Sequence, residues 1–216
     1  MPIFRLDKNI ISFPPCEMAE EDGLLAIGGD LCPERLLLAY TKGIFPWYNE
    51  GQPVLWWCPR ERFVIIPGEI KISKSMKKFI KKTDLSVKFN TDFSSVIHNC
   101  RIMREFNEGT WITDDMEEAY NKLHGMDFAQ SCEVWQGDRL VGGLYGVSIG
   151  RCFFGESMFS KVENASKLAL IALAQRLEEL NFEFIDCQFH TDHLESMGGK
   201  FISYGEYLDK IKRGIV

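Results

Sequence analysis

The sequence predicts an α+β protein in which a small N-terminal domain is followed by a larger domain with a mixed sheet. A tight turn at Gly137 and Asp138 separates two strand-like runs over 131–147, which predicts a hairpin. A further strand at 151–154 is followed by a long apolar helix that ends near Leu180. The composition changes near residue 62. We therefore expect domains at 1–62 and 63–216.

The first 62 residues are expected to be rich in turns and to contain one short helix. Residues 11–30 hold the prolines and glycines that are typical of an extended entry. Pro33 suits the first turn of a helix that runs to about Thr41, and Gly43 is the expected stop. A strand is then expected at 63–66.

Four tryptophans could either pack in the core or line a ligand site. Trp56 and Trp57 are interpreted first as a packed core of the small N-terminal unit. Trp47 follows Pro46 at the end of a loop, which makes it a better candidate for the wall of a ligand site. Trp111 lies just before an expected helix, where it can staple onto that helix or contact a ligand.

A short amphipathic helix is expected at about 73–82. Its five lysines follow helical i, i+3, i+4 spacing and share one face, without an acidic residue among them. They are Lys74, Lys77, Lys78, Lys81 and Lys82. A run of charge is usually only a solvated face. A structural helix would however alternate signs to gain ion pairs, so a polyanion is the alternative partner.

The remaining helices are placed by their caps. Asp92 is expected to cap a helix at 93–104, and Thr113 or Asp114 one that ends near residue 124. Asn164 is expected to cap the long apolar helix. Gly142 and Gly143 inside the returning strand of the hairpin indicate a bulge or a close backbone approach. A strand is expected at 182–187, and a last short helix at 204–211.

Charge, cysteine spacing and hydropathy indicate the compartment and the partners that we expect for the protein. The net charge of −6 by itself argues weakly against a nucleic-acid partner. Seven cysteines are widely spaced without a CxxC pair, so we expect reduced thiols rather than disulfides or a zinc site. No apolar run is long enough to span a membrane, and the start does not resemble a signal peptide. We expect a cytoplasmic protein that has no membrane partner and is a monomer.

Several catalytic motifs are absent from the sequence. It contains no GxxxxGK[ST] phosphate loop, no HExxH and no GxSxG. His190 and His193 form an HxxH pair without a clustered partner, so a surface pair is the expected reading and no metal or cofactor is expected.

The hairpin followed by strand, helix and strand is the arrangement of an acetyltransferase-like (GNAT) fold. Members that use acyl-coenzyme A bind its pyrophosphate with a glycine-rich turn before the central helix. The corresponding stretch here, residues 160–165, contains no glycine, and Glu163 would repel a phosphate. The sequence therefore indicates acyl transfer from a donor other than coenzyme A.

Three polar residues lie at the ends of the strands that flank this helix. Glu156 stands in an apolar run, where a lone carboxylate is costly unless it is paired, either within the fold or with a cationic amine. Asp186 and Gln188 are two residues apart and are expected to share a sheet face. Asp186 could orient the Gln188 amide, and the pair could position a nucleophilic amine.

Several motifs in order resemble the leucyl/phenylalanyl-tRNA–protein transferase family, from about residue 11 to the end. They are GLLAIGGD at 23–30, GIFPW at 43–47, WWCP at 56–59, GTWIT at 109–113, EVW at 133–135, LVGGLYGV at 140–147, GESMFS at 155–160, ENASK at 163–167 and IDCQ at 185–188. The resemblance implies a small N-terminal domain and a GNAT-like domain. It also implies transfer of Leu or Phe, and also Met, from aminoacyl-tRNA to an N-terminal Lys or Arg, which marks the acceptor protein for N-end-rule degradation.

The resemblance also implies roles for single residues. Asp186 and Gln188 would be the catalytic pair, and Glu156 would engage an ammonium group. Trp47 and Trp111 would clasp the terminal adenosine. The lysine face would dock tRNA. The implied substrate-binding residues are Trp47, Trp111, Tyr120, Phe153, Gly155, Met158, Leu170 and Ile185.

Two other functions compete with this one. A small-molecule N-acyltransferase that uses coenzyme A is disfavoured by the missing phosphate loop. A non-enzymatic RNA-binding module would need the lysine face but not Glu156.

Overall fold

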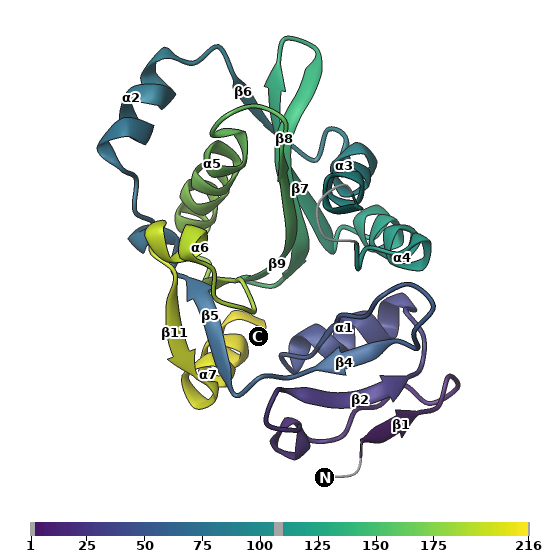
Figure 1. Ribbon diagram of the computed structural model, residues 1–216. Coiled ribbons are helices and arrows are strands. Elements are labelled where there is room, and N and C mark those ends of the chain that lie inside the picture. The colour runs from purple at the N-terminus through teal and green to yellow at the C-terminus, as the bar shows by residue number, and fades with distance from the viewer. Residues whose placement is uncertain (1–2, 106–109, 216) are drawn as a thin grey trace.

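Two sheets organise the chain in a computed structural model that describes residues 3–105 and 110–215, with side chains described at 3–103 and 110–215. The N-terminal sheet and the large sheet lie in different parts of the molecule (Figure 1). Gly109, the first residue of one family-like motif, lies outside the described residues. The expected α+β class with a mixed sheet is confirmed.

The N-terminal sheet has the order β1-β2-β4-β3 in the described residues. Its strands are β1 (Phe4–Leu6), β2 (Leu24–Gly28), β3 (Phe45–Pro46) and β4 (Leu55–Trp57). A short 3-10 helix η1 (Cys16–Met18) precedes β2, and α1 (Pro33–Thr41) follows it, with the predicted bounds and with proline in its first turn. Trp56 is fully buried and donates its Nε1–H to Gly28 O at 2.8 Å, so its core role is confirmed.

The large sheet has the order β11-β5-β10-β9-β8-β7-β6. Its strands are β5 (Glu61–Ile65), β6 (Ser86–Phe89), β7 (Ala129–Gln136), β8 (Arg139–Ile149), β9 (Cys152–Ser160), β10 (Phe184–Asp186) and β11 (Lys200–Ser203). β10 and β9 run parallel and the other pairs are antiparallel, so the sheet is mixed. The strand expected at 151–154 is longer than predicted, because β9 continues through the polar residues around Glu156 to pair with β8 along its whole length.

Helices cover both faces of the large sheet. α5 (Ala165–Glu179) packs on one face, and α3 (Phe93–Glu105) and α4 (Asp114–Gly125) pack on the other (Figure 1). α2 (Lys74–Lys82) lies at the periphery, while η2 (Pro67–Glu69), α6 (Asp192–Ser196) and α7 (Tyr204–Ile215) lie near the end of the sheet formed by β11 and β5. α7 extends four residues beyond the predicted end at Ile211, whose buried side chain anchors it. None of the described helices is both long and apolar enough to cross a bilayer.

Two of the three predicted helix caps are confirmed. Asp92 Oδ1 accepts the N–H of Ser95 at 3.2 Å, and Thr113 Oγ1 accepts that of Met116 at 3.3 Å. Asn164 precedes α5 as expected but makes no side-chain cap bond, because it adopts the left-handed conformation with φ 63°. The close approach expected at the paired glycines is real, since a Cβ at Gly142 would lie 2.5 Å from the Cβ of Ala165.

One expectation about the cysteines is wrong. The structure joins Cys16 and Cys58 in a disulfide, with a Cα–Cα distance of 5.8 Å across 42 residues of sequence. The pair could not be predicted from sequence spacing, because only the folding of the N-terminal sheet brings the two distant segments together. The other five cysteines form no disulfide in the described part of the chain, and three of them are buried.

Candidate active site

A cavity of about 450 Å³ opens where β3 of the N-terminal sheet faces β9 and β10 of the large sheet. Most of its lining is apolar, with a few polar groups on one side. Nine of the predicted site residues line it: Trp47, Trp111, Phe153, Gly155, Glu156, Met158, Leu170, Ile185 and Gln188. Asp186 and Tyr120 lie behind the wall, and the predicted lysines lie elsewhere on α2. A cavity with an apolar body and few polar groups is typical of a small-ligand site.

The apolar body of the cavity is formed by three elements. β9 supplies Phe153 and Met158, β10 supplies Ile185, and α5 supplies Leu170. Phe153, Ile185 and Leu170 are almost completely buried. The parallel register places Ile185 directly beside Phe153, so neighbouring strands present two of these side chains together. Such a pocket accepts an apolar side chain and leaves a polar one without hydrogen-bond partners.

Aromatic rings form the mouth of the cavity. Trp47 is 41% exposed, and its ring lies 5.7 Å from that of Trp57 and 5.4 Å from that of Phe189. Trp57 donates its Nε1–H to Trp47 O at 2.7 Å, which fixes the backbone that carries the exposed indole. Trp111 lies on the same cavity. The sequence reading missed Phe189, although its place directly after Gln188 was a usable signal.

Glu156 enters the cavity because β9 has a bulge. Tyr145 pairs with Ser157 and Gly146 with Gly155, so Glu156 is the extra residue between them. A β-bulge re-aims one side chain relative to the regular alternation. Gly146 permits the irregularity, because a Cβ there would collide with the carbonyl oxygen of Phe154.

Two tyrosines hold the Glu156 carboxyl group from behind. Tyr40 of α1 donates its O–H to Oε1 at 2.7 Å, and Tyr120 of α4 donates to Oε2 at 3.1 Å. The two tyrosine hydroxyls also contact each other. Burial raises the pKa of Glu156 to about 8, and the tyrosine hydrogen bonds only partly offset this. Burial, followed by the charge of Glu156, raises the pKa of both tyrosines well above the usual range, so they stay protonated as donors.

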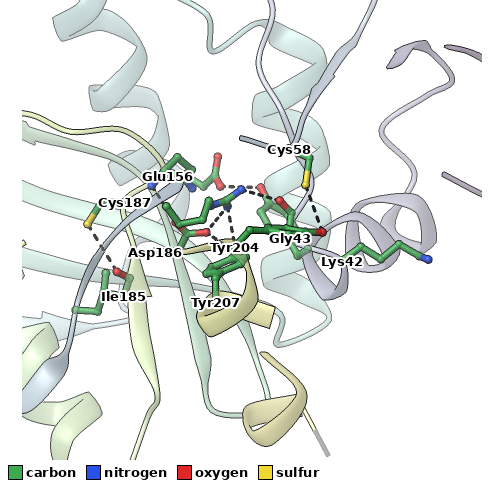
Figure 2. A network of polar contacts seen from close by, with 12 residues as sticks. Lys42, Gly43, Cys58, Glu156, Ile185, Asp186, Cys187, Tyr204 and Tyr207 are labelled. Carbon is green, nitrogen blue, oxygen red and sulfur yellow. Dashed lines mark hydrogen bonds and ion pairs between the residues drawn. The ribbon is translucent and has the colours of Figure 1, made fainter. Parts of the chain in front are cut away.

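Asp186 is sealed in a buried network instead of facing the cavity. Its Oδ2 pairs with Arg62 and accepts the O–H of Tyr207 at 2.7 Å (Figure 2). Both Asp186 and Arg62 are at most 1% exposed. Arg62 also donates to Gly43 O at 2.7 Å, and its guanidinium lies 4.5 Å from the Tyr207 ring centre. Burial lowers the pKa of Arg62, but the charge and hydrogen bond of Asp186 together with the nearby tyrosines Tyr207 and Tyr204 raise that pKa overall.

Asp186 reaches Gln188 through the backbone. Its Oδ1 accepts the backbone N–H of Gln188 at 2.9 Å, which differs from the expected contact with the side-chain amide. Gln188 has a φ of 57°, so it does not continue the strand alternation. The Phe189 N–H donates to Cys187 O at 2.7 Å and so closes a turn around Gln188. The Phe63 N–H donates to Gln188 O at 3.4 Å. A left-handed non-glycine residue costs about 1–3 kcal/mol and persists only where such contacts hold it.

The cavity also holds a thiol and an imidazole. Burial, and then the charge of Asp186, raises the pKa of Cys187 far above its usual range, so this thiol does not act as a thiolate nucleophile. His193 lines the cavity with a buried Nε2 that has no partner among the described atoms. His190 instead lies outside the cavity lining, where its Nε2 contacts Glu195 at 2.7 Å beside Asp192, in an exposed cluster.

The lysine face is confirmed as a surface of α2. Ser73 caps the helix by accepting the Met76 N–H at 3.1 Å, and Met76 is buried on the opposite side. The five lysines of this face, at 74, 77, 78, 81 and 82, are all exposed. None of them is in an ion pair with a described acidic side chain.

The mixed sheet with its bulge, and a cavity where a carboxyl and an amide meet an apolar pocket, agree with the acyltransferase and the acetyltransferase-like fold that the sequence predicts. Sequence comparison narrows the class. The model of the leucyl/phenylalanyl-tRNA protein transferase family matches residues 64–212, and that of the family's N-terminal domain matches residues 29–60. The chain belongs to the leucyl/phenylalanyl-tRNA protein transferase family and is an aminoacyltransferase.

Individual relatives match over nearly the whole chain. The leucyl/phenylalanyl-tRNA–protein transferase of Syntrophus aciditrophicus (strain SB) is 52% identical over 216 residues, which is 100% of this chain and 90% of that protein. The protein of the same name from Flavobacterium johnsoniae is 54% identical over 211 residues, 97% of this chain and 99% of its own length. Among solved structures, an aminoglycoside acetyltransferase from a soil metagenomic sample covers 62% of this chain and 88% of its own, with 14% identity and a TM-score of 0.39.

Proposed function

We propose that this cavity carries out the reaction of the family, the transfer of leucine or phenylalanine from aminoacyl-tRNA to the N-terminal lysine or arginine of an acceptor protein. One observation carries the proposal. An apolar pocket, two indoles and two amine-binding groups, Glu156 and Gln188, all line one cavity. Donor and acceptor can therefore meet in one place, and juxtaposition of reactants can supply about 7–11 kcal/mol of the barrier.

The donor end of aminoacyl-tRNA binds at the aromatic mouth. Trp47 and Trp111 hold the terminal adenosine by stacking, which contributes about 1–3 kcal/mol per base. The donor side chain enters the pocket formed by Phe153, Met158, Leu170 and Ile185, with Gly155 beside it. The same apolar lining suits leucine, phenylalanine and methionine.

The acceptor amine binds at the polar side of the cavity. Gln188 orients it, and Glu156 attracts its ammonium form. Asp186 acts as a positioning residue, because its contacts to Arg62, Tyr207 and the Gln188 backbone leave it buried behind the wall. Tyr120 acts through Glu156, which it bonds, since it does not line the cavity.

The lysine face of α2 docks the tRNA backbone. Its five exposed cations carry no acidic partners among the described side chains, so they can neutralise phosphates without first breaking ion pairs. This docking is separate from the cavity, which receives only the aminoacylated end.

The wider assignment follows from the same proposal. The product would carry a bulky N-terminal residue and enter N-end-rule degradation in the cytoplasm. The protein acts as a monomer without a cofactor, with domains at 1–62 and 63–216. The two separate sheets and the separate matches to the two parts of the family support this division.

The direct test is the transfer of radiolabelled leucine from charged tRNA to a peptide that begins with arginine. Label should enter the peptide, and ribonuclease treatment of the donor should abolish the transfer. Asp186→Ala and Gln188→Ala should each slow turnover strongly, and near-normal turnover in both would remove the proposed site. A thermal-shift scan with acetyl-coenzyme A tests the rival N-acyltransferase, which alone predicts stabilisation by that ligand.

A further inference from the structure

We propose that Glu156 accepts the proton released by the acceptor's α-ammonium group, and that Tyr40 and Tyr120 position it for that step. This inference rests on the proposed function. It assigns proton transfer to a residue that faces the cavity. It also makes Tyr40, for which the sequence predicted no role in the site, a positioning residue from the N-terminal part of the chain.

Access distinguishes the two acidic candidates. Glu156 lines the cavity, whereas Asp186 does not and is fully buried. Asp186 Oδ2 already has two partners, Arg62 and Tyr207, and Oδ1 accepts the backbone N–H of Gln188. Each oxygen of Glu156 receives one tyrosine hydroxyl, which leaves a second lone pair on each for an ammonium proton.

Glu156 is held rigidly because its two partners come from different parts of the fold. Tyr40 is on α1 and Tyr120 is on α4, and both side chains are at most 1% exposed. Glu156 itself is the extra residue of the bulge in β9. Three elements thus meet at one carboxyl group, which fixes its direction before the substrates arrive.

The charged and titratable groups that face Glu156 are known from each packed element. They are Tyr40 of α1, Tyr120 of α4, Asp186 of β10 and Arg62 of β5. Burial raises the pKa of Glu156 to about 8, which is close to the ordinary pKa of an α-amino group, about 7.7–8.0. Proton transfer between groups of matched pKa is nearly balanced in free energy, which is the favourable condition for general base catalysis near neutral pH.

The step balances in protons and bonds. The ionised Glu156 takes one proton from the bound ammonium and leaves a neutral amine. The amine nitrogen attacks the ester carbonyl carbon, so a C–N bond forms and the ester C–O bond breaks. The second proton passes from that nitrogen to the leaving ribose oxygen. Glu156 then releases its proton to water before the next turnover, and no further reactant is required.

The first experiment compares Tyr40→Phe with Tyr48→Phe. Each change removes one buried hydroxyl from the N-terminal part of the chain. The Tyr40 hydroxyl contacts Tyr120 of α4, and Tyr48 Oη lies 3.2 Å from Oγ1 of Thr113, the residue that caps α4. Tyr48 makes no described hydrogen bond to Glu156 and does not line the cavity. The readout is kcat/KM for an Arg-initiated peptide at saturating leucyl-tRNA, between about pH 6 and pH 9.

The hydrogen bond from Tyr40 favours the ionised carboxylate. Its loss should therefore move the acidic limb of the profile upward by about one pH unit, whereas Tyr48→Phe should leave the limb in place. The peptide is the same throughout, so the titration of its own amine does not contribute to the difference. Equal profiles for Tyr40→Phe and the wild type would overturn the inference.

The second experiment replaces the carboxyl groups themselves. Glu156→Gln keeps the shape and should lower kcat by about 10²–10⁴-fold while the KM for leucyl-tRNA stays within about twofold. Asp186→Asn should also slow transfer but keep an acidic limb, which should move to lower pH because the lost charge no longer raises the pKa of Glu156. A limb that persists in Glu156→Gln and disappears in Asp186→Asn would assign the proton to Asp186 and refute the inference. Absence of transfer in the wild type would instead refute the proposed function.

Discussion

Arg62 and Asp186 form a buried ion pair that joins β5 to β10 behind the wall of the cavity. Arg62 also donates to Gly43 O, so the same guanidinium ties the turn after α1 to the large sheet. Asp186 in turn holds the backbone of Gln188. A substitution at Arg62 should therefore affect stability and positioning together.

We expect Arg62→Leu to destabilise the protein by about 3–5 kcal/mol, because it leaves the Asp186 carboxylate buried without its counter-charge. Urea unfolding measures this loss. The double variant with Asp186→Leu should lose less than the sum of the two single variants. Additive losses would mean that the two side chains do not interact in solution.

The indoles should contribute mainly to donor binding. Trp47→Ala and Trp111→Ala should each lower kcat/KM for leucyl-tRNA by about 5- to 150-fold, as expected from 1–3 kcal/mol of stacking. The KM for the acceptor peptide should change little. Trp135→Phe on β7 is the control, because Trp135 lies outside the cavity lining. An equal effect of all three changes would argue for a general packing role.

The volume of the apolar pocket should set the donor preference. Leu170 is 2% exposed and projects from α5 into the cavity wall. Leu170→Phe should reduce transfer of phenylalanine more than that of leucine, and the ratio of their kcat/KM values should change by about 10- to 100-fold. Competition between the two charged tRNAs measures this ratio. An unchanged ratio would place the donor side chain elsewhere.

The lysine face should govern the salt dependence of tRNA binding. Replacing all five lysines of α2 with glutamine should weaken tRNA binding and flatten the slope of log K against log salt by about 0.7–0.9 for each phosphate that is no longer neutralised. The control replaces Lys122 and Lys200 with glutamine, because these lysines already pair with Glu118 and Glu69. Equal slopes in the α2 variant and the wild type would exclude this face as the tRNA site.

The Glu156 carboxyl should make stability depend on pH. Its pKa is about 8 in the folded protein, mainly because of burial, against an ordinary value of 4.5. Between these values the folded state binds more protons than the unfolded state, so this group lowers stability by up to about 1.4 kcal/mol per pH unit as pH rises.

Glu156→Gln should remove that loss and gain stability relative to the wild type from about pH 5 to pH 8. Urea unfolding at several pH values in this window measures the difference. A difference that stays constant with pH would show that Glu156 ionises normally in the folded protein.

Local sequence determined much of the fold. Pro33, Asp92 and Thr113 mark where helices begin, since caps act through neighbouring backbone groups. The lysine face follows from helical spacing alone. The family-like motifs also pointed to most of the residues that line the cavity.

Only the tertiary structure decided how those residues act. The bulge that turns Glu156 into the cavity, its bonds to Tyr40 and Tyr120, and the burial of Asp186 beside Arg62 join segments far apart in sequence. The Cys16–Cys58 disulfide joins distant segments in the same way. Sequence patterns report periodicity and caps over a few residues, whereas strand register and burial depend on the packing of the whole chain.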